Sequence, residues 1–337
     1  MPIKVSDPVY IPENTRAMLH RALYRATEAG MVADTAVSTV AELGDRDVAK
    51  RLKQAGNSIN KGRSYSAALS NYGLLTRFDL ALLHAGEAAG HISHMHKMLA
   101  DRYDSQFLRR SRLRVRMNVP VFTAILAMFV IPLPQLFSSA ISLMEYFMRS
   151  AGLIAVLVVL WKVLIKFYRQ YEMHGWPPFI TRTLELVPLF RKWLLTSARA
   201  EILENLAVLI EAGVPFQQAL ATCRECADDE YSRRLLEHAC RNAVDGAPAA
   251  QSLADAKLVD LREGYAIVST GEAAGKLPES LRHHALACQT YMENVWNRIA
   301  EWTPRMIYSV IALIIIKDIF TRYAAILAGT LSAGSGS

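Results

Sequence analysis

The stretch Gly271-Glu272-Ala273-Ala274-Gly275 occurs twice in this chain. The same five residues stand at Gly86-Glu87-Ala88-Ala89-Gly90, 185 residues earlier (271 minus 86). Two further matches keep nearly this spacing: Glu28-Ala29-Gly30 recurs as Glu211-Ala212-Gly213, and Gly62 with Leu69 recurs as Gly246 with Leu253. The three matches come in the same order both times, which indicates an internal repeat of roughly a hundred residues.

Apolar residues recur at spacings of three and four from Thr15 to about Leu83, which is typical of amphipathic helices. We expect Gly30 and Gly90 to end two helices as C-caps. We expect Asp34 and Asp45 to start two others as N-caps. No stretch has the alternating pattern of a β-strand, so the sequence predicts an all-α fold.

Three apolar stretches are predicted to be transmembrane helices, at 118–137, 151–168 and 304–328, since a span needs about 20 apolar residues. Basic residues flank the first two spans on one side only, and the short loop between them holds only Glu145 and Arg149. By the positive-inside rule this flank is cytoplasmic. The basic residues are Arg109, Arg110, Arg112, Arg114 and Arg116 before the pair, and Lys162, Lys166 and Arg169 at its end.

The expected fold class is therefore all-α, with two repeated cytoplasmic helical-bundle domains plus three transmembrane helices. The N-terminus would be cytoplasmic and the C-terminus periplasmic. The segments between the spans would be a first cytoplasmic domain (1–117), a periplasmic loop (138–150), a second cytoplasmic domain that repeats the first (169–303) and a flexible periplasmic tail (329–337).

This order of motifs, with a duplication that feeds membrane spans, resembles the type II secretion system F-protein family. The residues that carry the resemblance are Leu209-Ile210-Glu211-Ala212-Gly213-Val214-Pro215, Ala219-Leu220, Gly246, Gly271-Glu272-Ala273-Ala274-Gly275-Lys276-Leu277 and Leu281. The first copy is weaker, with Met31-Val32 in place of Val214-Pro215 and His91-Ile92 in place of Lys276-Leu277. The resemblance extends from about Arg16 to about Leu327.

The resemblance implies a non-enzymatic platform protein in the bacterial inner membrane, for assembly of a type IV pilus or of a type II secretion pseudopilus. Its implied partners are a cytoplasmic assembly ATPase, pilins or pseudopilins, other inner-membrane assembly proteins, membrane lipid and further copies of the chain. The sequence has no G-x4-G-K-[ST] loop, so ATP would be hydrolysed by another protein. No cofactor is expected.

Six residues of the repeated pentapeptide are candidate site residues: Gly86, Glu87, Gly90, Gly271, Glu272 and Gly275. Each glutamate lies at the unfavourable end of its own helix dipole and needs a partner, for which the positive N-terminus of the next helix or a nearby Arg or Lys is the candidate. Glu87 and Glu272 would then be either structural, locking a turn between helices, or contacts for the ATPase or another subunit.

Lys317, Asp318 and Arg322 fall inside the third predicted span, where charges are costly. Asp318 and Arg322 are four residues apart and can pair on one helix face. They are either a contact with a partner span or side chains that snorkel from a short, tilted helix. Their presence is also the main support for the alternative function, a subunit of a membrane transporter or channel.

Three other patterns favour an ordinary role over a metal or nucleic-acid site. Cys223 and Cys226, with His238 and Cys240, have a zinc-like spacing but lie in helical sequence, so buried free cysteines are expected and no metal. The histidines of the first copy and the His283-His284 pair are expected at the surface; those of the first copy are His84, His91, His94 and His96. The arginine cluster precedes a predicted span, which favours topology and anionic lipid over nucleic acid.

Overall fold

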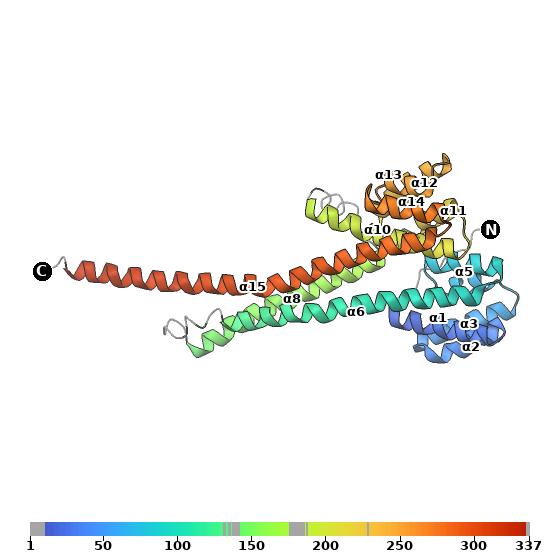
Figure 1. The fold of residues 1–337 in the computed structure, drawn as a ribbon. Coiled ribbons are helices and arrows are strands. Elements are labelled where there is room, and N and C mark those ends of the chain that lie inside the picture. The colour runs from blue at the N-terminus through green and yellow to red at the C-terminus, as the bar shows by residue number, and fades with distance from the viewer. Residues whose placement is uncertain are drawn as a thin grey trace. The chain divides into compact units, whose positions relative to one another are not determined.

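The computed structural model describes residues 11–130, 133, 136, 142–174, 186, 188–227 and 229–334. Every regular element in this part of the chain is a helix, as Figure 1 shows. The all-α prediction is therefore confirmed for the described residues.

The chain divides into two compact units. Unit 1 combines Met1–Arg110 with Trp176–Met292, and unit 2 combines Ser111–Gly175 with Glu293–Ser337. The domains predicted at 1–117 and 169–303 thus contribute to one unit, because their buried residues join a single hydrophobic cluster. We call residues 11–110 the first half of unit 1, and the described residues from 188 to 292 its second half.

The first half contains five α-helices, a single 3-10 turn and the start of a long helix. These are α1 (Glu13–Glu28), α2 (Ala33–Val40), η1 (Ala41–Leu43), α3 (Arg46–Asn60), α4 (Tyr65–Asn71), α5 (Arg77–Ala89) and α6 (Ile92–Val130). The second half follows the same order: α10 (Pro188–Glu211), α11 (Phe216–Cys226), α12 (Glu230–Val244), α13 (Ala249–Asp255), α14 (Glu263–Ala273) and α15 (Leu277–Gly334).

Four helix ends in each half have the same backbone geometry. In each, a residue one or two positions after the helix has a positive φ. Its N–H donates to the carbonyl three residues earlier, and the next N–H donates to the carbonyl five residues earlier. This is the Schellman motif, which satisfies the last carbonyl groups of a helix. The four pairs are Gly30 with Gly213, Gly62 with Gly246, Gly73 with Lys257, and Gly90 with Gly275.

Of the two predicted N-caps, only Asp45 takes the N-cap position, and neither side chain makes a capping hydrogen bond. Helix α2 begins at Ala33, so Asp34 lies in its first turn and accepts from the neighbouring Thr35 N–H at 2.7 Å. Asp45 does precede α3, but its side chain makes no capping hydrogen bond. Thr76 caps α5 instead, in a reciprocal capping box with Asp79.

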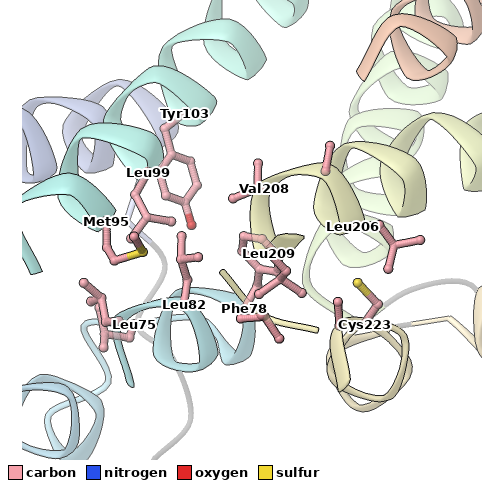
Figure 2. Packing of buried hydrophobic residues seen from close by; sticks show 14 of the residues in the cluster. Leu75, Phe78, Leu82, Met95, Leu99, Tyr103, Leu206, Val208, Leu209 and Cys223 are labelled. Atoms are coloured by element: carbon pink, nitrogen blue, oxygen red, sulfur yellow. The ribbon is translucent and has the colours of Figure 1, made fainter. Parts of the chain in front are cut away.

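The core of unit 1 draws on both halves. Figure 2 shows Phe78 and Leu82 of α5 in a cluster with α6 residues such as Leu99 and with second-half residues such as Leu209 and Cys223. Leu82, Leu99 and Leu209 are fully buried. Burying a leucine is worth about 1.5–3 kcal/mol, so this cluster is a major source of the stability of the unit.

Unit 2 contains α8 (Leu143–His174) together with the later parts of α6 and α15. The loop predicted at 138–150 is in part wrong, because α8 already begins at Leu143; residues 138–141 lie outside the described part. The tail predicted at 329–337 is likewise helical as far as Gly334.

Within the described residues, one stretch, Leu277–Thr321 of α15, is long and apolar enough to cross a membrane. Pro304 lies inside this helix without ending it, although proline removes one backbone hydrogen bond. The spans predicted at 118–137 and 151–168 stay predictions, and residues 131, 132, 134, 135 and 137 of the first lie outside the described part.

Candidate functional site

The first copy of the pentapeptide joins three helices. The Glu87 carboxylate, at the end of α5, accepts from the backbone N–H groups of Tyr65 at 2.6 Å and Ser66 at 3.1 Å. It also accepts from the Ser66 hydroxyl at 2.5 Å. These N–H groups are the first two of α4 and have no partner within their own helix. Gly90, with φ 75°, then turns the chain into α6.

The second copy has the same arrangement. The Glu272 carboxylate, on α14, accepts from the backbone N–H groups of Ala249 at 2.7 Å and Ala250 at 2.9 Å. These are the first two residues of α13, and Pro248 before them has no side chain that can cap. Gly275, with φ 70°, leads into α15.

The partner of each glutamate is thus a helix N-terminus, but the predicted helix, the next one in the chain, is wrong. It belongs to the short helix that precedes, and not to the long helix that follows. A negative charge at a helix N-terminus is favourable because it complements the dipole as well as the free N–H groups.

The first glycine of each copy allows a close helix approach. A Cβ on Gly86 would overlap the side chain of Met95 in α6. A Cβ on Gly271 would overlap Ser280 in α15, which is the matching residue 185 positions later. The pentapeptide therefore combines a close contact, a carboxylate cap and a turn within five residues.

A row of buried, hydrogen-bonded polar side chains extends into the core from Tyr65, whose backbone N–H is bound by Glu87. The Tyr65 hydroxyl lies 2.7 Å from His96 Nε2, and His96 Nδ1 lies 3.0 Å from His20 Nδ1. Burial lowers the pKa of His20 to about 4 and holds the pKa of His96 well below its usual range. Both imidazoles are therefore neutral at physiological pH.

A buried ion pair lies beside this row of side chains. Arg16 Nη1 is 3.2 Å from Asp79 Oδ2, and the Asp79 side chain is completely buried. The Tyr103 hydroxyl donates to the same carboxylate at 2.8 Å, and the Thr76 N–H donates at 3.0 Å. Burial, with the Asp79 charge adding to it, raises the pKa of Tyr103. The Asp79 charge is thus compensated on several sides, as a buried charge requires.

The prediction that the histidines lie at the surface is confirmed for some of them and wrong for others. His84, His91, His94 and His283 are exposed, but His96 and His284 are buried. His96 is wrongly predicted because its partners, His20 and Tyr65, lie far away in sequence.

The cysteine pattern gives free cysteines in the structure. Cys223 is buried, and burial raises the pKa of its thiol, which makes it a poor nucleophile. No cluster of three or more His, Cys, Asp or Glu suitable for a metal ion occurs among the residues that the structure describes.

The charges of the third predicted span are only partly described. Lys317 is exposed on α15, and its backbone carbonyl accepts from the Thr321 hydroxyl. The side chains of Asp318 and Arg322 lie outside the described residues, so their predicted pairing stays a prediction.

Comparison with known proteins gives consistent matches. The sequence model of the family described as type II secretion system (T2SS), protein F, matches residues 19–135 and 202–316. The type IV pilus assembly protein PilC of Thermus thermophilus is 26% identical over 305 residues, which cover 83% of this chain and 74% of that protein. The type 4 fimbrial assembly protein PilC of Pseudomonas putida is 24% identical over 304 residues, covering 82% and 73%.

Proposed function

Since this chain belongs to the family of type II secretion system protein F, we propose that it is an integral inner-membrane platform protein for type IV pilus or type II secretion assembly. In this role it would couple a cytoplasmic assembly ATPase to the insertion of pilins or pseudopilins into a fibre. The observation that carries the proposal is the family match over two separate segments of one chain.

We further propose three spans, at 118–137, 151–168 and 304–328, with unit 1 in the cytoplasm and the C-terminus in the periplasm. The apolar stretch of α15 supports the third span. Large apolar side chains exposed on unit 2 support a lipid environment, since contiguous apolar surface is unusual in water. On α8, within the proposed span, these are Val156, Val158, Val159 and Val163.

We also propose that the two halves of unit 1 are repeats of one helical bundle. Four matching helix ends and two matching carboxylate caps support this proposal. In this reading Glu87 and Glu272 are structural residues, because their carboxylates are engaged by backbone N–H groups of their own chain. The ATPase would then bind other residues of unit 1.

A deletion strain tests the function. Surface fibres, or secretion of a type II substrate, should be lost on deletion of the gene and return with the wild-type chain. Normal fibres and normal secretion in the deletion strain would contradict the proposal. Ion flux through vesicles that contain the purified chain alone would instead support the transporter alternative, and the platform proposal expects none.

A further inference from the structure

Two neighbouring arginines of α6 form ion pairs with different halves of unit 1. Arg110 Nη1 lies 2.9 Å from Glu13 of α1, in the first half. Arg109 Nη2 lies 3.2 Å from Glu204 Oε2 of α10, in the second half. The sequence suggested that this cluster serves topology and anionic lipid, but these two side chains have protein partners. Helix α6 is therefore held to both halves at Arg109 and Arg110, the last residues that it contributes to unit 1.

Glu204 has a second partner on the other long helix. Gln289 of α15 donates from Nε2 to Glu204 Oε2 at 2.8 Å. Gln289 precedes Met292, the last residue that α15 contributes to unit 1, by one helical turn. One carboxylate on α10 thus accepts from α6 and from α15 at the level where both helices pass into unit 2.

This contact is better shielded than an ordinary surface pair. The side chains of Arg109 and Glu204 are 22% and 17% exposed. The pair formed by Arg282 and Glu211 also joins α15 to α10, but its side chains are 50% and 39% exposed, and it does not reach α6. Solvent and salt weaken exposed pairs most, so the Glu204 contact should restrain its helices more strongly.

The matching position in the first half lacks this bridge. Arg21 and Asp104, which precede Glu204 and Gln289 by 183 and 185 residues, form an ion pair between α1 and α6. This pair joins two helices of the same half. Glu204 stands in the second half where Arg21 stands in the first. Its carboxylate can therefore bind Arg109 of the first half.

We propose that Glu204 is a positioning residue that couples α6 to α15, so that neither helix can turn or slide at this level without breaking its bond to Glu204. The proposal goes beyond the platform function and does not depend on it, because it concerns contacts within unit 1 only. If the platform function holds, both long helices would transmit one shared motion.

The test is a distance measurement by pulsed electron spin resonance on the full chain in detergent. Spin labels on genetically encoded residues would replace the exposed Ser105 of α6 and Leu286 of α15, which leaves the native cysteines unchanged. The variants are Arg109→Glu, Glu204→Arg and the two combined. We expect a single narrow distance in the wild type, its loss in each single variant, and its return in the combined variant.

Glu211→Gln is the matched control, because it weakens an α10–α15 contact that does not involve α6, and it should keep the narrow distance. Arg109→Ala is a milder variant that leaves the bond between Gln289 and Glu204 intact. Its helix content, measured by circular dichroism, should match the wild type while the distance broadens. A narrow distance in Arg109→Ala, or a combined variant as broad as the single ones, would overturn the proposal.

Discussion

The two halves of unit 1 have the same order of helices, but the side chains in their cores differ in polarity. The first half buries polar side chains at six matched positions where the second half has mostly apolar or small ones. The positions are Arg16, His20, Tyr65, Asp79, His96 and Tyr103 in the first half, and Arg199, Leu203, Ala249, Gly264, Leu281 and Cys288 in the second.

The reverse exchange also occurs. His284 of the second half stands where the first half has Leu99, and its Nε2 lies 3.6 Å from Asp260 Oδ1. Gly264 leaves the space for this pair, because a Cβ there would overlap both side chains. Helix ends and carboxylate caps are common to both halves, so these backbone contacts determine the path of the chain, whereas the core tolerates different solutions.

The largest effect should come from breaking the buried ion pair of the first half. Asp79→Ala leaves the Arg16 charge buried without its carboxylate and should cost about 3–5 kcal/mol. Asp260→Ala, in the second half, should cost less than about 1 kcal/mol, because its side chain is 42% exposed. Hydrogen exchange of α1 and α5 peptides in the full chain measures the first loss. Equal protection in both variants would mean that the ion pair does not stabilise the first half.

The next largest effect should come from a fall in pH, which should destabilise the first half of unit 1 more than the second. The folded pKa of His20, about 4, lies below the unfolded value of 6.5, mainly because of burial, with the Arg16 charge lowering it and the Asp79 charge opposing. The stability from neutral His20 is thus complete above pH 6.5 and is lost as pH falls toward 4. The loss at pH 5 should be about 2 kcal/mol, and His96 adds to it in the same direction.

Hydrogen exchange at pH 7 and pH 5, corrected for the intrinsic rates, checks this expectation, with α11 and α12 peptides as the internal reference. The double variant His20→Leu and His96→Leu copies Leu203 and Leu281. It should be less stable at every pH, since the Tyr65 hydroxyl loses its partner, but the pH dependence of the first half should largely vanish. An unchanged pH dependence would assign the effect to other groups.

Removing the carboxylate caps should have a smaller effect that differs between the halves. Glu87→Gln and Glu272→Gln should each destabilise unit 1 by about 1 kcal/mol, since each loses a charge at a helix N-terminus. Glu87→Gln should lower the free energy of unfolding more than Glu272→Gln, because the buried Ser66 hydroxyl also donates to the Glu87 carboxylate. In a Ser66→Ala background the two costs should become similar. Thermal unfolding of the full chain in detergent compares them; a larger cost for Glu272→Gln would contradict this account.

The smallest effect concerns Lys257, which stands in place of glycine at one of the four matched helix ends of the second half. Lys257 has φ 60°, where Gly73 has φ 68° in the first half. Lys257→Gly should stabilise by about 0.5 kcal/mol, because relief of the left-handed strain exceeds the entropy cost of glycine. Arg199 Nε donates to the Lys257 carbonyl, a bond that any residue retains. Lys257→Ala keeps the strain and should give no gain, whereas Gly73→Lys should destabilise by about 1 kcal/mol.

Features that depend on local backbone chemistry could be predicted from the sequence. Recurring glycines located three of the four matched helix ends. The fourth was missed because Lys257 carries no glycine signal, and only the 184-residue spacing from Gly73 could have found it. The partner of Glu87 and Glu272 was predicted wrongly as the N-terminus of the next helix or a nearby basic side chain, since the choice of the preceding helices α4 and α13 depends on tertiary packing.

Features that depend on distant residues could not be predicted. The burial of His96 follows from its contacts with His20 and Tyr65, 76 and 31 residues away. The bridge at Glu204 likewise joins residues 95 and 85 positions apart. Asp34 and Asp45 matched the residue preference of N-caps, but one lies inside its helix and the other makes no side-chain bond to its helix.

The most direct test of the central claim is recovery of the assembly ATPase with the full-length chain from solubilised membranes. The wild-type chain should retain the ATPase, and so should Glu87→Gln and Glu272→Gln variants that hydrogen exchange shows to be folded. Failure of the wild-type chain to retain the ATPase would contradict the platform role. Loss of the ATPase only in the folded Glu variants would contradict the structural role of the two glutamates.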